Sequence, residues 1–170
     1  MREEAPTIRR LTVVDVADYR AIRLEALERE PGSFLSSYAR EAGMSEEAWR
    51  DRLANPKGAI FGVYLGSEIV GLTGVVVDAH DAEQGVLVQG YLRADLRGRG
   101  HSRLLYEARI GWAREVGLRR LKVSHRVDNL KSREAILRNG FQRTGTKSTT
   151  WPDGTIAEEW VYTLDLSDRP

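Results

Sequence analysis

The sequence predicts one α/β domain over residues 1–170, in which a mixed sheet of about seven strands is layered with about four helices. Two observations lead to this prediction. Strand-like and helical hydrophobic patterns follow one another in the order βααβββαβαββ, which is typical of layered α/β folds. The chain of 170 residues is also long enough to bury one full core.

The first half of the chain is predicted to contain one strand, two helices and a hairpin. The segment Thr12-Val13-Val14-Asp15 resembles a helix-capping box with Asp in place of Glu. Pro31-Gly32 and Asn55-Pro56 end the two helices, and Gly66-Ser67 turns the hairpin. The expected elements are a strand over 7–11, a helix from Thr12 to about Glu28, a loop over 33–43, a helix over 45–53 and strands over 59–65 and 68–77.

The second half is predicted to contain two strand–helix units and a final pair of strands. The first of these helices has one apolar stripe, which is expected to face the sheet and consists of Leu104, Leu105, Ala108, Trp112 and Val116. The expected elements are a polar turn over 80–85, strands over 85–92 and 121–125, helices over 102–116 and between Asn129 and Gly140, strands over 141–147 and 158–166, and a tail over 167–170.

Composition argues against several functions. The net charge of +1 gives no general attraction to nucleic acid or to an anionic membrane. Without cysteine the chain has neither a disulfide nor a thiol nucleophile, and its three histidines are too scattered for a zinc signature. Because no apolar run reaches ~18 residues and the first residues lack a signal-peptide core, we expect a cytoplasmic protein with no metal and no nucleic-acid or membrane partner.

The segment between the strand over 85–92 and the following helix has the composition of a phosphate-binding loop. It reads Arg97-Gly98-Arg99-Gly100-His101-Ser102. Glycines let the backbone approach a ligand closely, and the unpaired N–H groups at a helix start attract anions. The loop is not a P-loop, because no Gly-Lys-Ser/Thr follows four spacer residues. Nor is it a dinucleotide fingerprint, because Arg103 stands where the third glycine is required.

A second block follows at a distance of one helix and one strand. There Asn129 opens a helix that ends at Gly140-Phe141. As residue types, Asn is suited to cap a helix and Gly to end one in the left-handed conformation. Together, the two blocks resemble the cofactor segments of the GCN5-related N-acetyltransferases (GNAT family), whose loop has the pattern Q/R-x-x-G-x-G/A. Arg97 and Gly100 fit that pattern, and Ser102 replaces its last small residue.

The resemblance implies an N-acetyltransferase that uses acetyl-coenzyme A (acetyl-CoA), with splayed central strands and a bulge before the loop. The loop would hold the pyrophosphate, exposed backbone of the preceding strand would pair with the amide arm of the cofactor, and an Asn would bind the pantetheine. The residues that these roles imply are Tyr91, Leu92, Arg93, Arg97, Gly98, Arg99, Gly100, His101, Ser102 and Asn129. The arginines around the loop form either a solvated face or a field that attracts phosphates.

The sequence departs from the family at the position of the frequent general-acid tyrosine, which here is Ile136. An isoleucine cannot protonate the leaving thiolate. Water, Ser132, Tyr91 and His125 are the possible replacements, and His125 is the candidate catalytic residue because histidine exchanges protons near neutral pH. The alternative for His125 is a hydrogen-bonded strand histidine, and Glu83 either acts as a base or is a solvated turn residue. The acid and base stay unassigned.

The acceptor is expected to meet the first two helices, the loop between them and the last hairpin. Arg23 lies in the apolar arc of the first helix, where it either extends to the domain edge or binds an acidic group of the acceptor. Ser36 and Tyr38 line the loop, and Trp151 lies near the hairpin tip. The acceptor would be an amine of a small molecule or peptide. The resemblance also implies a homodimer, since many members pair.

Two other functions compete with this interpretation. A non-catalytic acyl-CoA-binding or sensor domain would keep the loop and Asn129 without turnover, and Ile136 favours it. A nucleotide- or nucleic-acid-binding module would use the arginine cluster, but the near-zero net charge argues against it.

Overall fold

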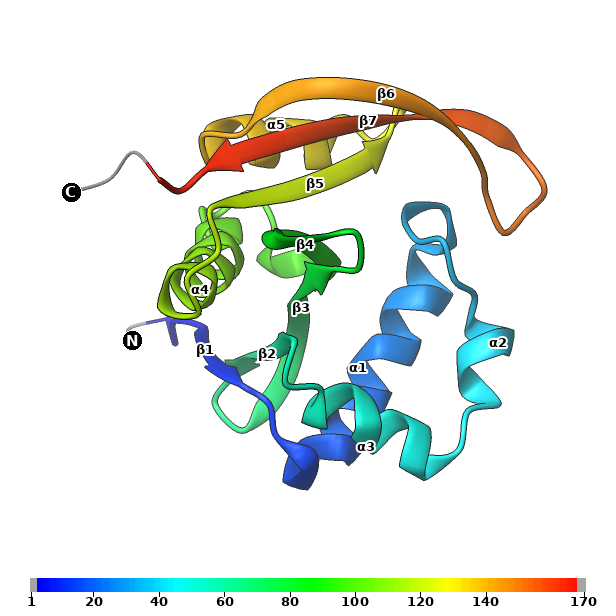
Figure 1. Ribbon diagram of the computed structural model, residues 1–170. Coiled ribbons are helices and arrows are strands. Elements are labelled where there is room, and N and C mark those ends of the chain that lie inside the picture. Colours follow the sequence, from blue (N-terminus) through cyan, green and yellow to red (C-terminus); the bar gives the residue numbers. More distant parts are fainter. Residues whose placement is uncertain (1–2, 168–170) are drawn as a thin grey trace.

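A mixed seven-stranded sheet with the order β1-β2-β3-β4-β5-β7-β6 organises the computed structural model, which describes residues 3–167 (Figure 1). Neighbouring strands are antiparallel except β4 and β5, which are parallel. The strands are β1 (Thr7–Arg10), β2 (Gly58–Leu65), β3 (Glu68–Asp78), β4 (Asp81–Leu92), β5 (Arg120–Arg126), β6 (Gln142–Thr150) and β7 (Ile156–Asp165). The α-helices are α1 (Val16–Arg29), α2 (Tyr38–Ala42), α3 (Glu46–Ala54), α4 (Ser102–Glu115) and α5 (Leu130–Arg138). The predicted α/β fold is confirmed.

Two predicted connections are wrong. The short helix α2 lies inside the predicted loop over 33–43, where the Ser37 hydroxyl accepts the Arg40 N–H at 3.2 Å. Five residues are too few to reveal a helical period. The predicted polar turn over 80–85 is mostly strand, because β4 begins at Asp81 and pairs there with Asp78. Of the predicted tail over 167–170, residues 168–170 lie outside the described part of the chain.

The buried face of α4 is rotated from the predicted stripe. Val116 follows the helix as its cap and is 50% exposed. The residues that α4 buries are Leu105, Tyr106, Arg109, Trp112 and Ala113. The buried face of α4 therefore includes a tyrosine and an arginine, two residues that the predicted apolar stripe does not contain.

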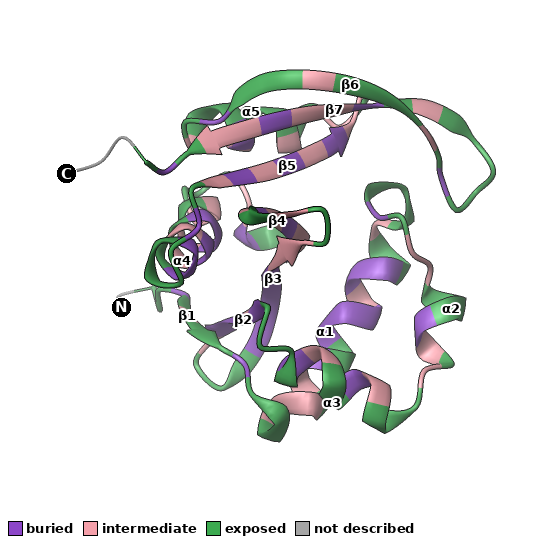
Figure 2. Cartoon of the chain, viewed as in Figure 1, coloured by how far each residue is buried: buried purple, intermediate pink, exposed green. Residues whose placement is uncertain are grey.

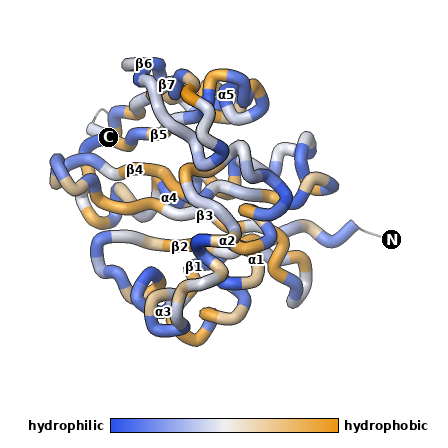
Figure 3. The backbone as a smooth tube through the Cα atoms, turned by 90° about the vertical axis from the view of Figure 1, so that its right-hand side faces the viewer, coloured by the Kyte–Doolittle hydropathy of each residue, from blue (hydrophilic) through white to orange (hydrophobic). Residues whose placement is uncertain are grey.

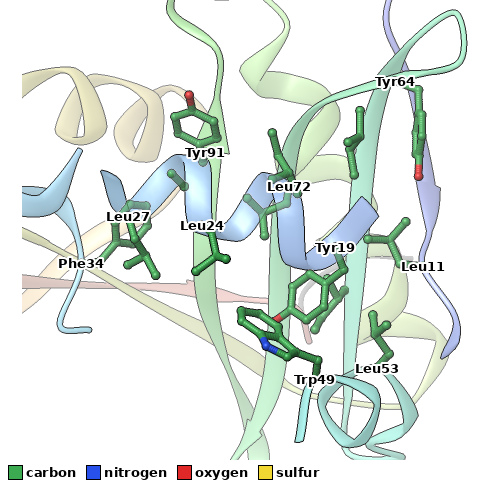
Figure 4. Close-up of a cluster of buried hydrophobic side chains, with 14 residues drawn as sticks. Leu11, Tyr19, Leu24, Leu27, Phe34, Trp49, Leu53, Tyr64, Leu72 and Tyr91 are labelled. Carbon is green, nitrogen blue, oxygen red and sulfur yellow. The ribbon is translucent and has the colours of Figure 1, made fainter. Parts of the chain in front are cut away.

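Helices cover both faces of the sheet. On one face, α1 and α3 pack on β2, β3 and β4 through a cluster in which Tyr19 meets Trp49 edge to face, with ring centroids 5.4 Å apart (Figure 4). On the other face, α4 packs on β1 to β5 and α5 packs on β5, and the cluster between them and the sheet includes Tyr106, Leu121 and Ile136. Hydrophobic residues concentrate along β2 (Figure 3), and most of β2 and β3 is buried, whereas the outermost strand β6 is mostly exposed (Figure 2).

The sheet divides between β4 and β5. These strands share only three register pairs, Gln84–Arg120, Gly85–Leu121 and Val86–Lys122, and then separate (Figure 1). One arm therefore contains β1 to β4 and the other contains β5, β7 and β6. This is the splayed arrangement that the family resemblance implied.

A β-bulge interrupts β4 shortly before the loop. Thr73 of β3 lies opposite two residues of β4, Gln89 and Gly90, because the register shifts there. Gln89 has φ +58°, which is uncommon for a residue with a side chain. The Tyr19 hydroxyl donates to Gln89 Oε1 at 2.9 Å and so ties the bulge to α1.

Candidate active site

The predicted phosphate loop lies directly before α4. Gly98 and Gly100 have φ values of +73° and +82°, which glycine adopts without strain. Among residues 3–167, no group accepts a hydrogen bond from the backbone N–H groups of residues 98–103. These N–H groups stand at the positive end of a 14-residue helix. Free N–H groups at such a helix start form a binding site for a phosphate or pyrophosphate.

Arg97 links this loop to the end of β4. Its Nε donates to the Leu92 carbonyl at 2.6 Å, its guanidinium forms an ion pair with Glu30, and its Cζ lies 5.7 Å from the centre of the Tyr91 ring. Arg97 therefore helps to fix the loop backbone relative to the strand, in addition to any charge it offers a ligand.

Fewer backbone groups of β4 face the gap than the predicted segment 91–93 would provide. The Arg93 N–H donates to the Val70 carbonyl of β3 at 3.0 Å. Because backbone groups alternate along an antiparallel strand, the N–H and carbonyl of Leu92 point away from β3. The Leu92 carbonyl already accepts a hydrogen bond from Arg97. The Leu92 N–H is therefore the backbone group in this segment that is suited to bind the amide arm of a cofactor.

The side chains next to Leu92 are occupied within the protein. Arg93 pairs with Glu25 at 2.9 Å and with Glu68 at 2.6 Å, and these contacts raise the pKa of Arg93. The Tyr91 hydroxyl donates to Glu25 at 3.0 Å, and burial together with this bond raises the pKa of Tyr91 to about 12. Tyr91 therefore releases its proton reluctantly near neutral pH.

Two other arginines remain half or more exposed beside the loop. Arg99 pairs with Glu3 at 2.8 Å, and Arg103 pairs with Glu107 at 2.9 Å on the surface of α4. Exposed ion pairs contribute little and exchange readily. Both guanidinium groups are thus accessible to an anionic ligand.

The second predicted cofactor segment has the expected local structure. The Asn129 side chain caps α5 by accepting the Ser132 N–H at 3.2 Å, and Gly140 follows the helix with φ +90°. The cap uses Asn129 Oδ1 and leaves its amide nitrogen to donate elsewhere. Ile136 is completely buried on the inner face of α5.

Two further acid and base candidates, His125 and Glu83, already have partners within the protein. His125 is buried, with Nδ1 2.6 Å from the Arg126 carbonyl and Nε2 2.9 Å from the Tyr162 hydroxyl. Because both ring nitrogens are engaged, His125 has the contacts of a structural strand histidine. Glu83 is exposed and pairs with Arg119 at 3.5 Å.

A cavity of about 540 Å³ is lined by Ser36, Tyr38 and Trp151, three of the residues that the sequence analysis names for the acceptor. It lies between the end of α1, the loop leading into α2, the end of β5 and the turn between β6 and β7. Its lining residues are Leu27, Glu28, Pro31, Gly32, Ser36, Ser37, Tyr38, Ala39, Arg126, Trp151, Pro152 and Asp153.

Arg23 is not part of this lining. It is buried and donates two hydrogen bonds of 2.9 Å to Glu41, a residue of α2. Arg52 of α3 adds a third contact to Glu41 at 2.6 Å. Arg23 therefore neither extends to the domain edge nor lies free in the cavity, because its charge is neutralised inside the protein.

Arg126 is a cavity residue that the sequence reasoning missed. Its guanidinium lies 5.3 Å from the Trp151 ring centre and forms ion pairs with Asp128 at 3.3 Å and Asp153 at 3.9 Å. Strand alternation was the available signal, because it places Arg126 and His125 on opposite faces of β5. Arg126 thus supplies a cation, and Glu28 and Asp153 supply anions, at one cavity.

Two further features bear on the possible function. Over residues 3–167, no helix has the length and hydrophobicity needed to cross a bilayer. The same residues contain no group of three or more His, Asp or Glu side chains placed to hold a metal ion.

Solved structures with the same fold include several acetyltransferases. A GNAT-family acetyltransferase from Streptococcus pneumoniae aligns with a TM-score of 0.79 and 18% identity, over 95% of this chain and 100% of that one. The ribosomal-protein-S5-alanine acetyltransferase of Vibrio fischeri gives 0.81 and 16%, over 100% and 98%. The yncA protein of Salmonella typhimurium, solved with acetyl-CoA, gives 0.79 and 16%, over 97% and 96%. At these identities the likeness establishes the fold.

The sequence comparisons differ in outcome. No curated protein matches the chain at a significant level. The model of the acetyltransferase (GNAT) family matches residues 17–141, a range that includes the phosphate loop, the bulged strand β4 and the Asn129 helix. The chain therefore belongs to the acetyltransferase (GNAT) family, as an N-acetyltransferase whose acyl donor is acetyl-CoA.

Proposed function

We propose that the protein transfers the acetyl group of acetyl-CoA directly to a primary amine of a small molecule or peptide bound in the cavity near Trp151. The observation that carries this proposal is the row of unpaired N–H groups at residues 98–103, close to the open edge of β4. That arrangement suits a pyrophosphate whose attached arm runs along β4 into the gap between the two arms of the sheet.

Different residues around the gap would bind different parts of acetyl-CoA. The N–H groups of residues 98–103 would hold the pyrophosphate, with Arg99 and Arg103 supplying charge. The Leu92 N–H would bind the amide arm or the thioester oxygen, where a backbone donor stabilises developing negative charge. The free amide nitrogen of Asn129 would contact the pantetheine from the other arm of the sheet.

The cavity suits an amine acceptor. Glu28 and Asp153 attract a cationic amine, while Ser36 and Tyr38 offer hydroxyl groups that orient it. Structures with the same fold that are named as ribosomal-protein-alanine acetyltransferases include one from Vibrio fischeri and one from Brucella melitensis. This favours peptide amino termini as one acceptor class to test beside small amines.

A thermal-shift titration with acetyl-CoA, coenzyme A and ATP, followed by an amine and peptide panel, tests the proposal. Ligand at a hundred times its dissociation constant stabilises by about 2.7 kcal/mol, which raises Tm by about 5–10 °C. We expect this rise with both coenzyme A species and not with ATP, and then acetylation of at least one amine. No rise with any ligand at millimolar concentration would refute the proposed site.

A further inference from the structure

Arg109 is a buried cation without a counter-ion. It lies on the inner face of α4 with 4% of its surface exposed, and no carboxylate among residues 3–167 lies within 4.0 Å of it. Its Nε donates to the Leu105 carbonyl at 3.0 Å, and its Cζ lies 4.6 Å from the centre of the Tyr106 ring. Burial lowers the pKa of Arg109 to about 10, so it stays protonated near neutral pH. Burying an uncompensated charge costs stability, which calls for an explanation.

The guanidinium reaches the bulge in β4. A Cβ atom placed on Gly90 would lie 4.0 Å from Arg109 Nη1 and 3.9 Å from Thr73 Oγ1. The Thr73 hydroxyl is completely buried and makes no hydrogen bond with the described residues. Gly90 itself is exposed. A guanidinium without a counter-ion and a hydroxyl without a hydrogen-bond partner thus both lie beside an open backbone position at which the absence of a side chain leaves space.

An anion that is present only with the bound ligand would give Arg109 a counter-charge and the Thr73 hydroxyl an acceptor. In the proposed function the amide arm of the cofactor runs along β4, and the thioester lies near Leu92, two residues from Gly90. During transfer the amine nitrogen attacks the carbonyl carbon, the C–S bond breaks, and its electron pair remains on sulfur. The amine proton goes to water. Negative charge therefore appears on sulfur, and Ile136 offers nothing to stabilise it.

We propose that Arg109, assisted by the Thr73 hydroxyl, stabilises the thiolate of coenzyme A as it leaves. This inference rests on the proposed function, because it needs the thioester at the bulge. This role explains why a cation is buried here. Packing alone does not explain it, because an apolar side chain of similar length would fill the same space with a smaller loss of folding free energy.

The decisive variant is Arg109→Met, which keeps the volume and removes the charge. We expect its Tm to equal or exceed that of the wild type, its affinity for acetyl-CoA to stay within about threefold, and kcat to fall by about 10²–10³-fold, as for loss of one stabilising donor. The pKa of the thiol of bound coenzyme A, followed by the ultraviolet absorbance of the thiolate, should rise. Arg114→Met, an exposed change on the same helix, serves as the neutral control.

A second variant keeps the proposal falsifiable should Arg109→Met fold poorly. The methyl group of Gly90→Ala fits at ordinary contact distances and fills the space between Arg109 and Thr73. It should therefore lower kcat without lowering Tm. An unchanged kcat and an unchanged pKa of the bound thiol in both variants would overturn the role of Arg109. A wild-type protein that binds coenzyme A but acetylates no amine would instead refute the proposed function, and the thiol titration would still test Arg109.

Discussion

A charged substitution at Gly100 would disturb the proposed pyrophosphate site through both backbone conformation and charge. Gly100 has φ +82°, and no atom lies within 4 Å of a Cβ placed there. Gly100→Glu therefore fits sterically, but it strains the backbone and places a negative charge among the free N–H groups of residues 98–103. We expect acetyl-CoA binding, measured by calorimetry, to weaken by about tenfold or more, or ~1.4 kcal/mol.

The matched control for this loop variant is Gly111→Glu. Gly111 lies on the exposed side of α4, and a Cβ placed there also has no atom within 4 Å, so the change adds the same charge away from the loop. Its affinity for acetyl-CoA should equal that of the wild type. Equal binding by both variants would remove the loop from the cofactor site.

Ile136 shows why the tyrosine common in the family cannot simply be restored. The side chain is completely buried in the cluster that contains Tyr106 and Phe141. A tyrosine at this position is larger and brings a hydroxyl group into the core, so Ile136→Tyr should lower the free energy of unfolding by about 1–3 kcal/mol. Urea denaturation measures this change. Unchanged stability would mean that the phenol reaches open space, such as the gap between β4 and β5.

Among the elements, α2 depends most on one buried charge network. Burial opposes ionisation of Glu41, but hydrogen bonds from Arg23, Ser36 and Arg52 outweigh it and lower the pKa of Glu41 from 4.5 to about 2. Because the pKa of this carboxyl is lower in the folded state than in the unfolded state, Glu41 stabilises the folded state fully above pH 4.5. This stabilisation is lost as the pH falls toward 2. The contribution is on the order of 3 kcal/mol.

Glu41→Gln should remove this part of the pH dependence. It should also lower stability at pH 7 by about 3–5 kcal/mol, because it leaves Arg23 buried without a counter-charge. Urea denaturation between pH 3 and pH 7 measures both effects, with Glu47→Gln as the exposed control on α3. Parallel pH curves for wild type and Glu41→Gln would show that Glu41 does not titrate as described.

The elements that the sequence predicted well are those with strong local signals. The α4 start after two glycines and the α5 start at Asn129 were predictable because capping and left-handed turns depend on a few adjacent residues. The ion pair of Arg23 and the position of Arg109 beside Gly90 were not predictable, because they come from tertiary contacts. Arg23 meets Glu41 across 18 residues of sequence, and Arg109 of α4 lies beside Gly90 at the bulge of β4.

At the scale of the whole molecule, strand pairing between the two arms of the sheet is limited to three register pairs of β4 and β5. The proposed cofactor contacts lie on both arms, with Leu92 and residues 98–103 on one side and Asn129 on the other. Bound acetyl-CoA would therefore act as an additional link across the gap and suppress local opening of the segments that line it.

Hydrogen exchange followed by mass spectrometry tests this coupling. With saturating acetyl-CoA, amides in residues 88–104 and 123–133 should exchange more slowly, while those of β1 and β2, on the far edge of the sheet, should change little. Protection confined to residues 98–103 would mean that the ligand binds the loop without bridging the arms. Uniform protection of all strands would mean that the ligand slows exchange through global stability alone, so the two arms open together rather than separately.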